Sequence, residues 1–254
     1  MILDRVEHPA WRSNTWLVAA AAGKSGFLVD AGGPVEPVLE LIARHRVRVE
    51  AILLTHHHHD HAGEAGSLAG SLDAEIYAHR DEIPLLGAEG RAGARPTHPL
   101  DDGATLTAGG LAIRLLHIPG HTAGQAAWLV EDEVVFTGDT LFRGSVGSTV
   151  APGHTTFADL RRSLVDRLLA LPDRVQVAPG HAEPSTIGAE RTGNPFLRVM
   201  TGAERESDER CRYSLRPARL VVWAPDYDGG HKAWVRFDNG DEATVPGSRV
   251  ERSR

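Results

Sequence analysis

The sequence has almost no cysteine, because Cys211 is the one cysteine in 254 residues. No disulfide can therefore form within the chain. A metal site built from several thiolates is excluded too, because each thiolate ligand needs its own cysteine. Long apolar runs are missing as well. The stretch 16–22 is apolar, but it is far shorter than the roughly 20 residues that a membrane-spanning helix needs, so no membrane partner is expected.

Positive charge is also scarce. The chain has 27 Lys and Arg residues against 34 Asp and Glu residues, a formal net charge of −7, whereas nucleic-acid-binding proteins carry a basic surface. Nucleic acid is therefore not an expected partner. The first residues contain no basic segment followed by an apolar one, which is the pattern of a secretory signal, so we expect a cytoplasmic location. A homodimer is compatible with this composition.

The most informative stretch is the histidine run His-His-His-His-Asp-His at residues 56–61. It follows an apolar segment, 49–55, that predicts a buried strand, and it precedes small residues, 62–67, that can begin a helix. On such a turn the side chains can converge on one point, and imidazole and carboxylate groups are good ligands for zinc and other first-row metals. An engineered tag would be terminal and uniform, whereas this run is internal and contains an aspartate.

Three later loops repeat this pattern, because each follows an apolar strand and presents one potential ligand. These residues are His121 and His181, both in Pro-Gly-His, and Asp139, in Thr-Gly-Asp-Thr. A neighbouring glycine allows a tight turn that brings the ligand inward. The combined set predicts two metal sites, one held by His56, His58 and His121 and the other by Asp60, His61 and His181, with Asp139 bridging them. His57 and His59 do not fit the ligand positions, and we expect them to support the site or face solvent.

Strands, helices and ligand-bearing loops alternate along residues 1–200, which predicts a layered α/β or α+β sandwich with its site at one edge of the sheets. Residues 201–214 are rich in charge and are interpreted as a linker. Residues 215–254 contain three expected strands and an Asp-Asn-Gly-Asp hairpin signal, which predict a small SH3- or Tudor-like β-meander. Its aromatic residues would form either a binding cage or the core of the sheet, and we favour the core; they are Trp223, Tyr227, Trp234 and Phe237.

Taken together, these motifs resemble the metallo-β-lactamase superfamily. The motifs stand in the order and approximate spacing of that family: the histidine run, Pro-Gly-His-Thr at 119–122, Phe-Thr-Gly-Asp-Thr-Leu-Phe at 136–142 and Pro-Gly-His at 179–181. They are most similar to glyoxalase II, the hydroxyacylglutathione hydrolase group, and the stretches 186–191 and 194–197 look like its short bacterial type. The resemblance covers residues 1–200 and implies for them an α/β fold, the αβ/βα four-layer metallo-β-lactamase sandwich. The small C-terminal β-meander predicted above would follow it.

The resemblance also implies a chemistry, that of a dinuclear-metal hydrolase. A hydroxide held between two metal ions would attack the carbonyl of a thioester of a low-molecular-weight thiol. Two divalent ions are expected, with zinc as first choice and iron or manganese also suited. Asp60 is the expected catalytic residue, since its carboxylate can orient the hydroxide, and Arg143 is the expected substrate-binding residue. The helical C-terminal domain that larger glyoxalase II enzymes use for glutathione is not visible, so the thiol carrier stays open.

Other functions compete with this one. A mononuclear-iron persulfide dioxygenase uses a similar scaffold, but the full second ligand set, Asp60, His61 and His181, favours the hydrolase. Another ester or lactone hydrolase of the same fold is a further alternative. A binding module with a vestigial site is disfavoured, because all seven potential ligands are present.

Overall fold

The computed structural model describes residues 1–88 and 97–252. The chain folds into two compact units that interleave along the sequence. The first unit comprises 1–117, 124–138 and 180–182, and the second comprises 118–123, 139–179 and 183–254. Among the helices of the described residues, none is long and apolar enough to cross a membrane.

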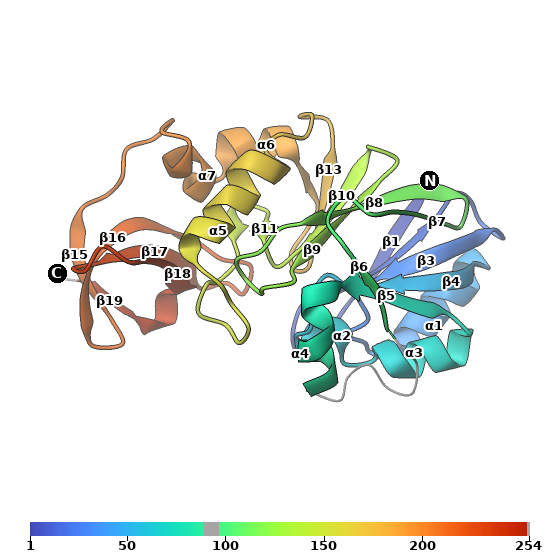
Figure 1. The fold of residues 1–254 in the computed structure, drawn as a ribbon. Helices are drawn as coiled ribbons and strands as arrows, with labels where there is room; N and C mark the ends of the chain where they lie inside the picture. The colour runs from blue at the N-terminus through green and yellow to red at the C-terminus, as the bar shows by residue number, and fades with distance from the viewer. Residues whose placement is uncertain (89–96, 253–254) are drawn as a thin grey trace. The chain divides into compact units, whose positions relative to one another are not determined.

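The first unit is built on a six-stranded sheet whose strands follow one another in chain order (Figure 1). The strands are β1 (Ile2–Glu7), β2 (Asn14–Ala19), β3 (Ser25–Val29), β4 (Arg48–Leu53), β5 (Glu75–His79) and β6 (Thr97–Leu100). Strands β1 to β3 pair in antiparallel fashion, and β3 to β6 pair in parallel. Parallel neighbours need crossover connections, and helices supply them between β3, β4 and β5. The carboxyl ends of β3 and β4 therefore open toward the same edge.

Helices α1 (Val35–His45) and α3 (Ala65–Leu72) cover one face of this sheet (Figure 1). The buried side of α1 presents Val38, Leu41 and Ile42 at helical spacing, and Leu68 of α3 joins them against strand residues such as Ile52. Full burial of each such side chain contributes about 1.5–3 kcal/mol. The short helices α2 (His59–Ala62) and α4 (Ile83–Ala88) and the 3₁₀ turn η1 (Arg80–Glu82) complete the connections. This packing fixes the edge at which the histidine run lies.

Four more strands of the first unit form an antiparallel meander in the order β10-β9-β8-β7. They are β7 (Thr105–Ala108), β8 (Leu111–His117), β9 (Ala126–Val130) and β10 (Val134–Gly138). Every residue of β9 and β10 is buried. Buried and exposed residues therefore do not alternate along these two strands. Gly103, Gly109 and Gly110 all have positive φ, which glycine adopts without steric cost.

The second unit begins with two short hairpin strands and a helical segment. Its elements up to residue 200 are β11 (Leu141–Phe142), β12 (Ser145–Val146), α5 (Phe157–Arg162), the π-helical turn η2 (Ser163–Leu168), β13 (Gln176–Pro179), β14 (Ser185–Thr186), α6 (Ile187–Gly193) and α7 (Pro195–Met200). A capping box between Thr156 and Asp159 starts α5, and Asn194 caps α7 by accepting hydrogen bonds from two backbone N–H groups. Side-chain caps of this kind stabilise a helix start by about 1 kcal/mol.

The unit ends in a five-stranded antiparallel sheet, which we call the C-terminal sheet, in the order β18-β17-β16-β15-β19. Its elements are β15 (Glu209–Tyr213), β16 (Arg216–Pro225), β17 (His231–Phe237), β18 (Glu242–Pro246), the 3₁₀ turn η3 (Gly247–Arg249) and β19 (Val250–Arg252). The sheet has five strands, whereas the sequence predicts three. It starts inside the segment 201–214, so the interpretation of this segment as a linker is wrong for its last part. Cys211 and Tyr213 alternate with exposed residues and face the core of the sheet, which the local excess of charge had hidden.

The C-terminal sheet is fastened to the rest of the second unit. The backbone N–H of Thr149 donates to the Thr244 carbonyl at 2.9 Å, and the Thr244 hydroxyl donates to the Gly147 carbonyl at 2.6 Å. The rings of Phe157 and Trp234 lie 4.6 Å apart. Trp234 is therefore a docking contact, whereas Phe237 belongs to the core of the sheet and Trp223 packs against that core.

Candidate metal centre

The seven predicted metal ligands are divided between the two units. The first unit carries His56, His58, Asp60, His61 and His181. The second unit carries His121 and Asp139. Within each unit the predicted residues come together, while the bridging position of Asp139 stays a prediction.

The histidine run leaves the carboxyl end of β4 and enters α2, the turn that the sequence predicts. His56 Nε2 lies 3.0 Å from His58 Nδ1, and their ring centroids are 4.6 Å apart. Where the backbone is extended, residues two apart point to the same face and direct neighbours point to opposite faces. His58 still has extended backbone angles, φ −58° and ψ 149°, so the imidazoles of His56 and His58 share one side of the run before α2 begins.

Asp60, His61 and His181 form a compact triangle of potential ligand atoms. Asp60 Oδ2 lies 3.4 Å from His61 Nε2 and 3.3 Å from His181 Nε2, and the two Nε2 atoms are 3.3 Å apart. Two donors of a tetrahedral zinc ion, with bonds of about 2.0–2.1 Å, lie about 3.4 Å from one another. The triangle thus has the edge lengths of three corners of a tetrahedral metal site, and its nitrogen and oxygen donors suit zinc or iron.

Hydrogen bonds to two other segments of the chain fix the backbone around His181. The N–H of Gly180 donates to the Gly138 carbonyl at 2.9 Å, and the N–H of Asn14 donates to the Gly180 carbonyl at 2.7 Å. His181 itself forms an isolated bridge with Ser13. The final Pro-Gly-His loop is therefore held at the same edge as the histidine run, although 120 residues separate His181 from His61.

Asp30, at the end of β3, orients both groups of ligands in the first unit. Its Oδ2 accepts a hydrogen bond from His61 Nδ1 at 2.8 Å and another from the Thr55 hydroxyl at 2.9 Å, and Thr55 Oγ1 lies 3.0 Å from His56 Nδ1. A carboxylate behind a ligating histidine fixes its tautomer and leaves the other nitrogen for the metal. Asp30 is fully buried, and this burial raises its pKa against the opposing effect of the hydrogen bonds from His61 and Thr55.

The sequence does not reveal this role of Asp30, which stands directly after an apolar segment. One signal was available. Gly32 follows two residues later, and a Cβ there would overlap the backbone of Asp60, so the chain after β3 passes directly against the histidine run. A glycine two residues after a strand-terminal aspartate is too common a pattern to have identified the contact alone.

His57 and His59, which we expect to support the site or face solvent, differ in their surroundings. His57 is buried, and both its backbone N–H and its Nδ1 contact Oε1 of the buried Glu82. The second oxygen of Glu82 accepts the N–H of Gly124 at 2.9 Å. His59 is exposed, with its ring edge-on to Trp11 at 6.4 Å. Glu82 therefore ties the histidine run to the loop before β9, a role that its position in the sequence does not reveal.

In the second unit, His121 and Asp139 lie side by side. His121 Nδ1 is 2.9 Å from the Ser148 carbonyl, which makes Nδ1 the donor. The other ring nitrogen, Nε2, lies 3.6 Å from Asp139 Oδ2. Gly120 has a φ of +149°, and a Cβ there would overlap Leu160. A Cβ at Gly147 would overlap the Asp139 carbonyl oxygen. Both glycines are therefore required by close approach next to a ligand.

The loop that follows Asp139 is anchored by Glu190 and Asn194. Glu190 Oε2 accepts the N–H of Gly144 at 2.9 Å and the side-chain amide of Asn194 at 2.9 Å. The same amide donates to the Ser145 carbonyl at 3.0 Å. Both side chains are buried. The stretches 186–191 and 194–197, which entered the sequence analysis only through resemblance, thus position the loop that carries a predicted ligand.

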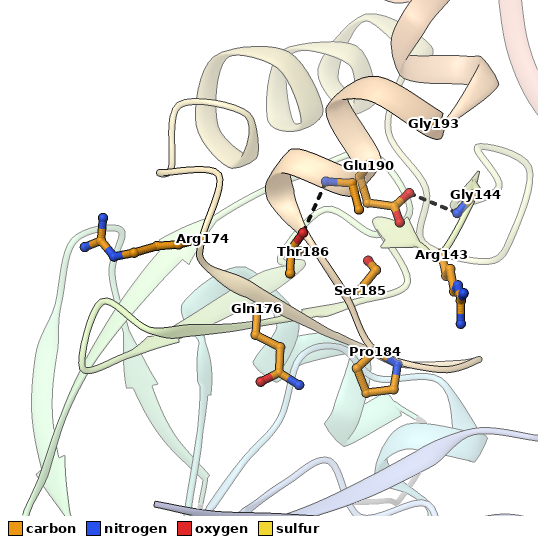
Figure 2. Close-up of a pocket in the computed structure, with 10 residues that line it drawn as sticks. Arg143, Gly144, Arg174, Gln176, Pro184, Ser185, Thr186, Glu190 and Gly193 are labelled. Atoms are coloured by element: carbon orange, nitrogen blue, oxygen red, sulfur yellow. Dashed lines mark hydrogen bonds between the residues drawn. The ribbon is translucent and has the colours of Figure 1, made fainter.

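Arg143 lines a pocket of about 680 Å³ in the second unit (Figure 2). Its neighbours there include Arg174, Gln176, Ser185 and Glu190. Figure 2 shows the side chains of Arg143 and Arg174 extending on opposite sides of this pocket. The exposed Arg143 guanidinium is therefore accessible to an anion, and its predicted contact with substrate stays a prediction.

Comparison with known proteins agrees with this donor chemistry. Residues 8–181 match the family model of the metallo-beta-lactamase superfamily. An uncharacterized protein of Mycobacterium tuberculosis is 37% identical over 211 residues, covering 74% of this chain and 94% of the relative. The hydroxyacylglutathione hydrolase GloC of Haemophilus influenzae is 32% identical over 187 residues, covering 68% of this chain and 88% of the relative.

A solved structure, that of TTHA1623 in a di-iron-bound form, is 35% identical with a TM-score of 0.67, covering 76% of this chain and all of the other. The α/β fold class inferred from the motifs, the αβ/βα sandwich with a C-terminal β-meander, is thereby confirmed. The chain belongs to the metallo-beta-lactamase superfamily and is a metal-dependent hydrolase of that fold with metal-binding clusters of histidine and aspartate.

Proposed function

We propose that the protein is a dinuclear-metal thioesterase that hydrolyses S-acyl derivatives of a low-molecular-weight thiol. One metal ion would be held by His56, His58 and His121, and the other by Asp60, His61 and His181. Asp139 would bridge them. Zinc suits these nitrogen and oxygen donors best, and iron is the alternative that the di-iron form of TTHA1623 supports.

The observation that carries the proposal is the triangle of Asp60, His61 and His181. Its three edges of 3.3–3.4 Å fit three corners of a tetrahedral ion, and Asp30 already holds His61 in the tautomer that points Nε2 into the triangle. The pair of His56 and His58, at 3.0 Å, provides the start of a separate site. These two groups of donors are what a dinuclear centre requires.

When bound, divalent metal ions lower the pKa of a coordinated water to about 7 and stabilise negative charge on a carbonyl oxygen. The residues of the chain then have defined tasks. Asp60 orients the attacking water and accepts its proton as the oxygen adds to the thioester carbon. When the C–S bond breaks, Asp60 returns the proton to the leaving sulfur, and the products are a carboxylic acid and a thiol. Asp30 and the Ser148 carbonyl keep the imidazoles of His61 and His121 in the required orientation.

The thioester as substrate rests on the similarity to GloC, whose name states hydroxyacylglutathione hydrolysis. The test is a panel of S-lactoyl thioesters of glutathione, mycothiol, bacillithiol and coenzyme A, assayed with protein whose metal content has been measured. We expect at least one of them to be hydrolysed with a kcat/KM of about 10⁴ M⁻¹ s⁻¹ or more. Hydrolysis of aryl esters or lactones without any thioesterase activity would contradict the proposal.

The mononuclear-iron persulfide dioxygenase is the main competitor within the enzymes. It predicts oxygen consumption with a persulfide substrate, and it assigns no metal-binding task to the complete Asp60–His61–His181 triangle. An oxygen-electrode assay on the iron-loaded protein separates the two functions directly. Oxygen uptake with persulfide and no release of free thiol from any thioester would replace our proposal with this one.

A further inference from the structure

The C-terminal sheet shares a cavity with the two predicted ligands of the second unit. This cavity has a volume of about 310 Å³. His121 and Asp139 line one part of it, and Tyr227, Lys232 and Arg249 of the C-terminal sheet and its turns line another. The matched family region ends at residue 181, so this wall is an addition to the part of the chain that the family model describes.

Ring packing, an ion pair and a hydrogen bond hold this wall of the cavity in place. The ring of Tyr227 lies 5.2 Å from that of Phe142, which follows Asp139 in the same loop. Lys232 Nζ is 3.0 Å from Asp226 Oδ2, and Asp226 Oδ1 accepts a hydrogen bond from the Ser145 hydroxyl at 2.8 Å. The Lys232 and Asp226 side chains are both more than nine-tenths buried. Their charges therefore compensate each other and hold the sheet against the loop that carries Asp139.

Arg249 differs from Lys232, because its side chain is exposed and forms no ion pair among residues 1–88 and 97–252. Its backbone is nevertheless fixed at the end of η3. The Arg249 carbonyl accepts the N–H of Ser214 at 3.4 Å, and Gly247, two residues before it, packs so closely on His231 that a Cβ would overlap the backbone. The Arg249 guanidinium, carried on this fixed backbone, presents five donors in a planar fork that matches carboxylate and phosphate oxygens.

We propose that the C-terminal sheet is a specificity element and that Arg249 binds an anionic group, a carboxylate or a phosphate, on the thiol carrier of the substrate. The inference rests on the proposed function and adds to it the class of carrier and the residue that selects it. Arg249 is the cation of the cavity wall whose charge stays available to substrate, since Asp226 neutralises Lys232. Tyr227 supplies an apolar ring beside it, against which the alkyl part of a carrier can pack.

The test compares Arg249→Gln with the wild type on three S-lactoyl thioesters. Glutathione carries carboxylates, coenzyme A carries phosphates, and N-acetylcysteamine is uncharged. We expect Arg249→Gln to raise KM about tenfold for one or both charged carriers, the magnitude of a lost charge-assisted hydrogen bond, and to leave kcat unchanged. For the uncharged carrier, kcat/KM should stay within twofold of the wild type. The carrier that shows the larger change identifies the anion.

The matched control is Arg212→Gln, because Arg212 is an exposed arginine of β15 in the same sheet and is absent from the cavity wall as described. It should behave as the wild type on all three substrates. The inference is overturned if Arg249→Gln changes KM equally for charged and uncharged carriers, or for none of them. If no thioester is hydrolysed at all, the proposed function fails; the inference is then judged by calorimetric binding of glutathione and coenzyme A to the metal-loaded protein, and equal affinities for wild type and Arg249→Gln would overturn it.

Discussion

At the scale of single residues, the histidine run shows how alternating neighbours are given different tasks. His56, His58 and His61 direct ring nitrogens to other potential ligands, while His57 turns to Glu82 and His59 to solvent. The spacing of the run predicts this division. The partners that enforce it, Asp30 and Glu82, could not be found from the sequence, because each lies about 25 residues from the run and neither stands in a recognisable pattern.

The first prediction contrasts His58→Ala with His57→Ala. His58→Ala should abolish activity and lower the metal content, because it deletes a predicted ligand of one of the two sites. His57→Ala should leave the metal content of the folded protein nearly unchanged but lower the free energy of unfolding by about 3–5 kcal/mol, because it leaves the buried Glu82 carboxylate without its imidazole partner. The measurements are metal analysis by mass spectrometry and urea unfolding. If both variants lose metal equally per folded chain, the assignment of the run is wrong.

At the scale of elements, the loops after the strands carry the site, and buried side chains far along the chain hold those loops in place. The sequence predicts that His121, Asp139 and His181 follow strands, because apolar runs end in glycine beside each of them. It does not predict that Glu190 and Asn194 anchor the loop after Asp139, since these contacts join segments about 45 to 50 residues apart. It also misses β15, because charged residues alternate there with only a few buried ones.

The second prediction concerns the close approach of Gly147 to Asp139. Gly147→Ala would place a Cβ against the Asp139 carbonyl oxygen, so the ligand loop must shift. We expect at least a tenfold loss of activity with the fold retained, as measured by steady-state kinetics and circular dichroism. Gly70→Ala is the matched control, because a Cβ there meets nothing within 4 Å in helix α3, and it should raise stability by about 0.5–1 kcal/mol. Full activity of Gly147→Ala would show that the loop is not constrained in this way.

At the scale of the whole molecule, the scarcity of cysteine and of positive charge limits the possible functions as much as the motifs do. A single cysteine leaves histidine and carboxylate groups as the metal ligands, and a net charge of −7 disfavours nucleic acid as a partner. The fold class followed from the motifs together with their family resemblance. The extent of the C-terminal sheet did not, because its docking depends on tertiary contacts such as Thr149 with Thr244, which no local pattern encodes.

The third prediction concerns the pH dependence of stability, through Glu206 and Arg236. The Arg236 guanidinium donates to both carboxylate oxygens of Glu206, at 2.7 and 3.0 Å, and these hydrogen bonds hold the pKa of Glu206 below its usual value of 4.5. A lowered folded-state pKa means that the pair stabilises the protein above about pH 4.5 and that this contribution is lost as the pH falls through the folded-state pKa. Since both side chains are more than one-third exposed, the contribution is less than about 1 kcal/mol.

Glu206→Gln should therefore lower Tm by no more than about 4 °C at pH 7, with a difference that shrinks as the pH is lowered from 5 toward 3. Differential scanning calorimetry across this range measures it. The control is Glu36→Gln at the exposed start of α1. A difference that stayed constant with pH, or that grew in acid, would contradict the assigned role of the pair.

The central claim is that two metal ions bind per chain, and counting them tests it most directly. Mass-spectrometric metal analysis of the purified, active protein should give close to two ions per chain for the wild type and close to one for His181→Ala, since the second ligand triangle loses a corner while His56, His58 and His121 remain. One ion per chain in the active wild-type protein, or an unchanged count in His181→Ala, would contradict the dinuclear account.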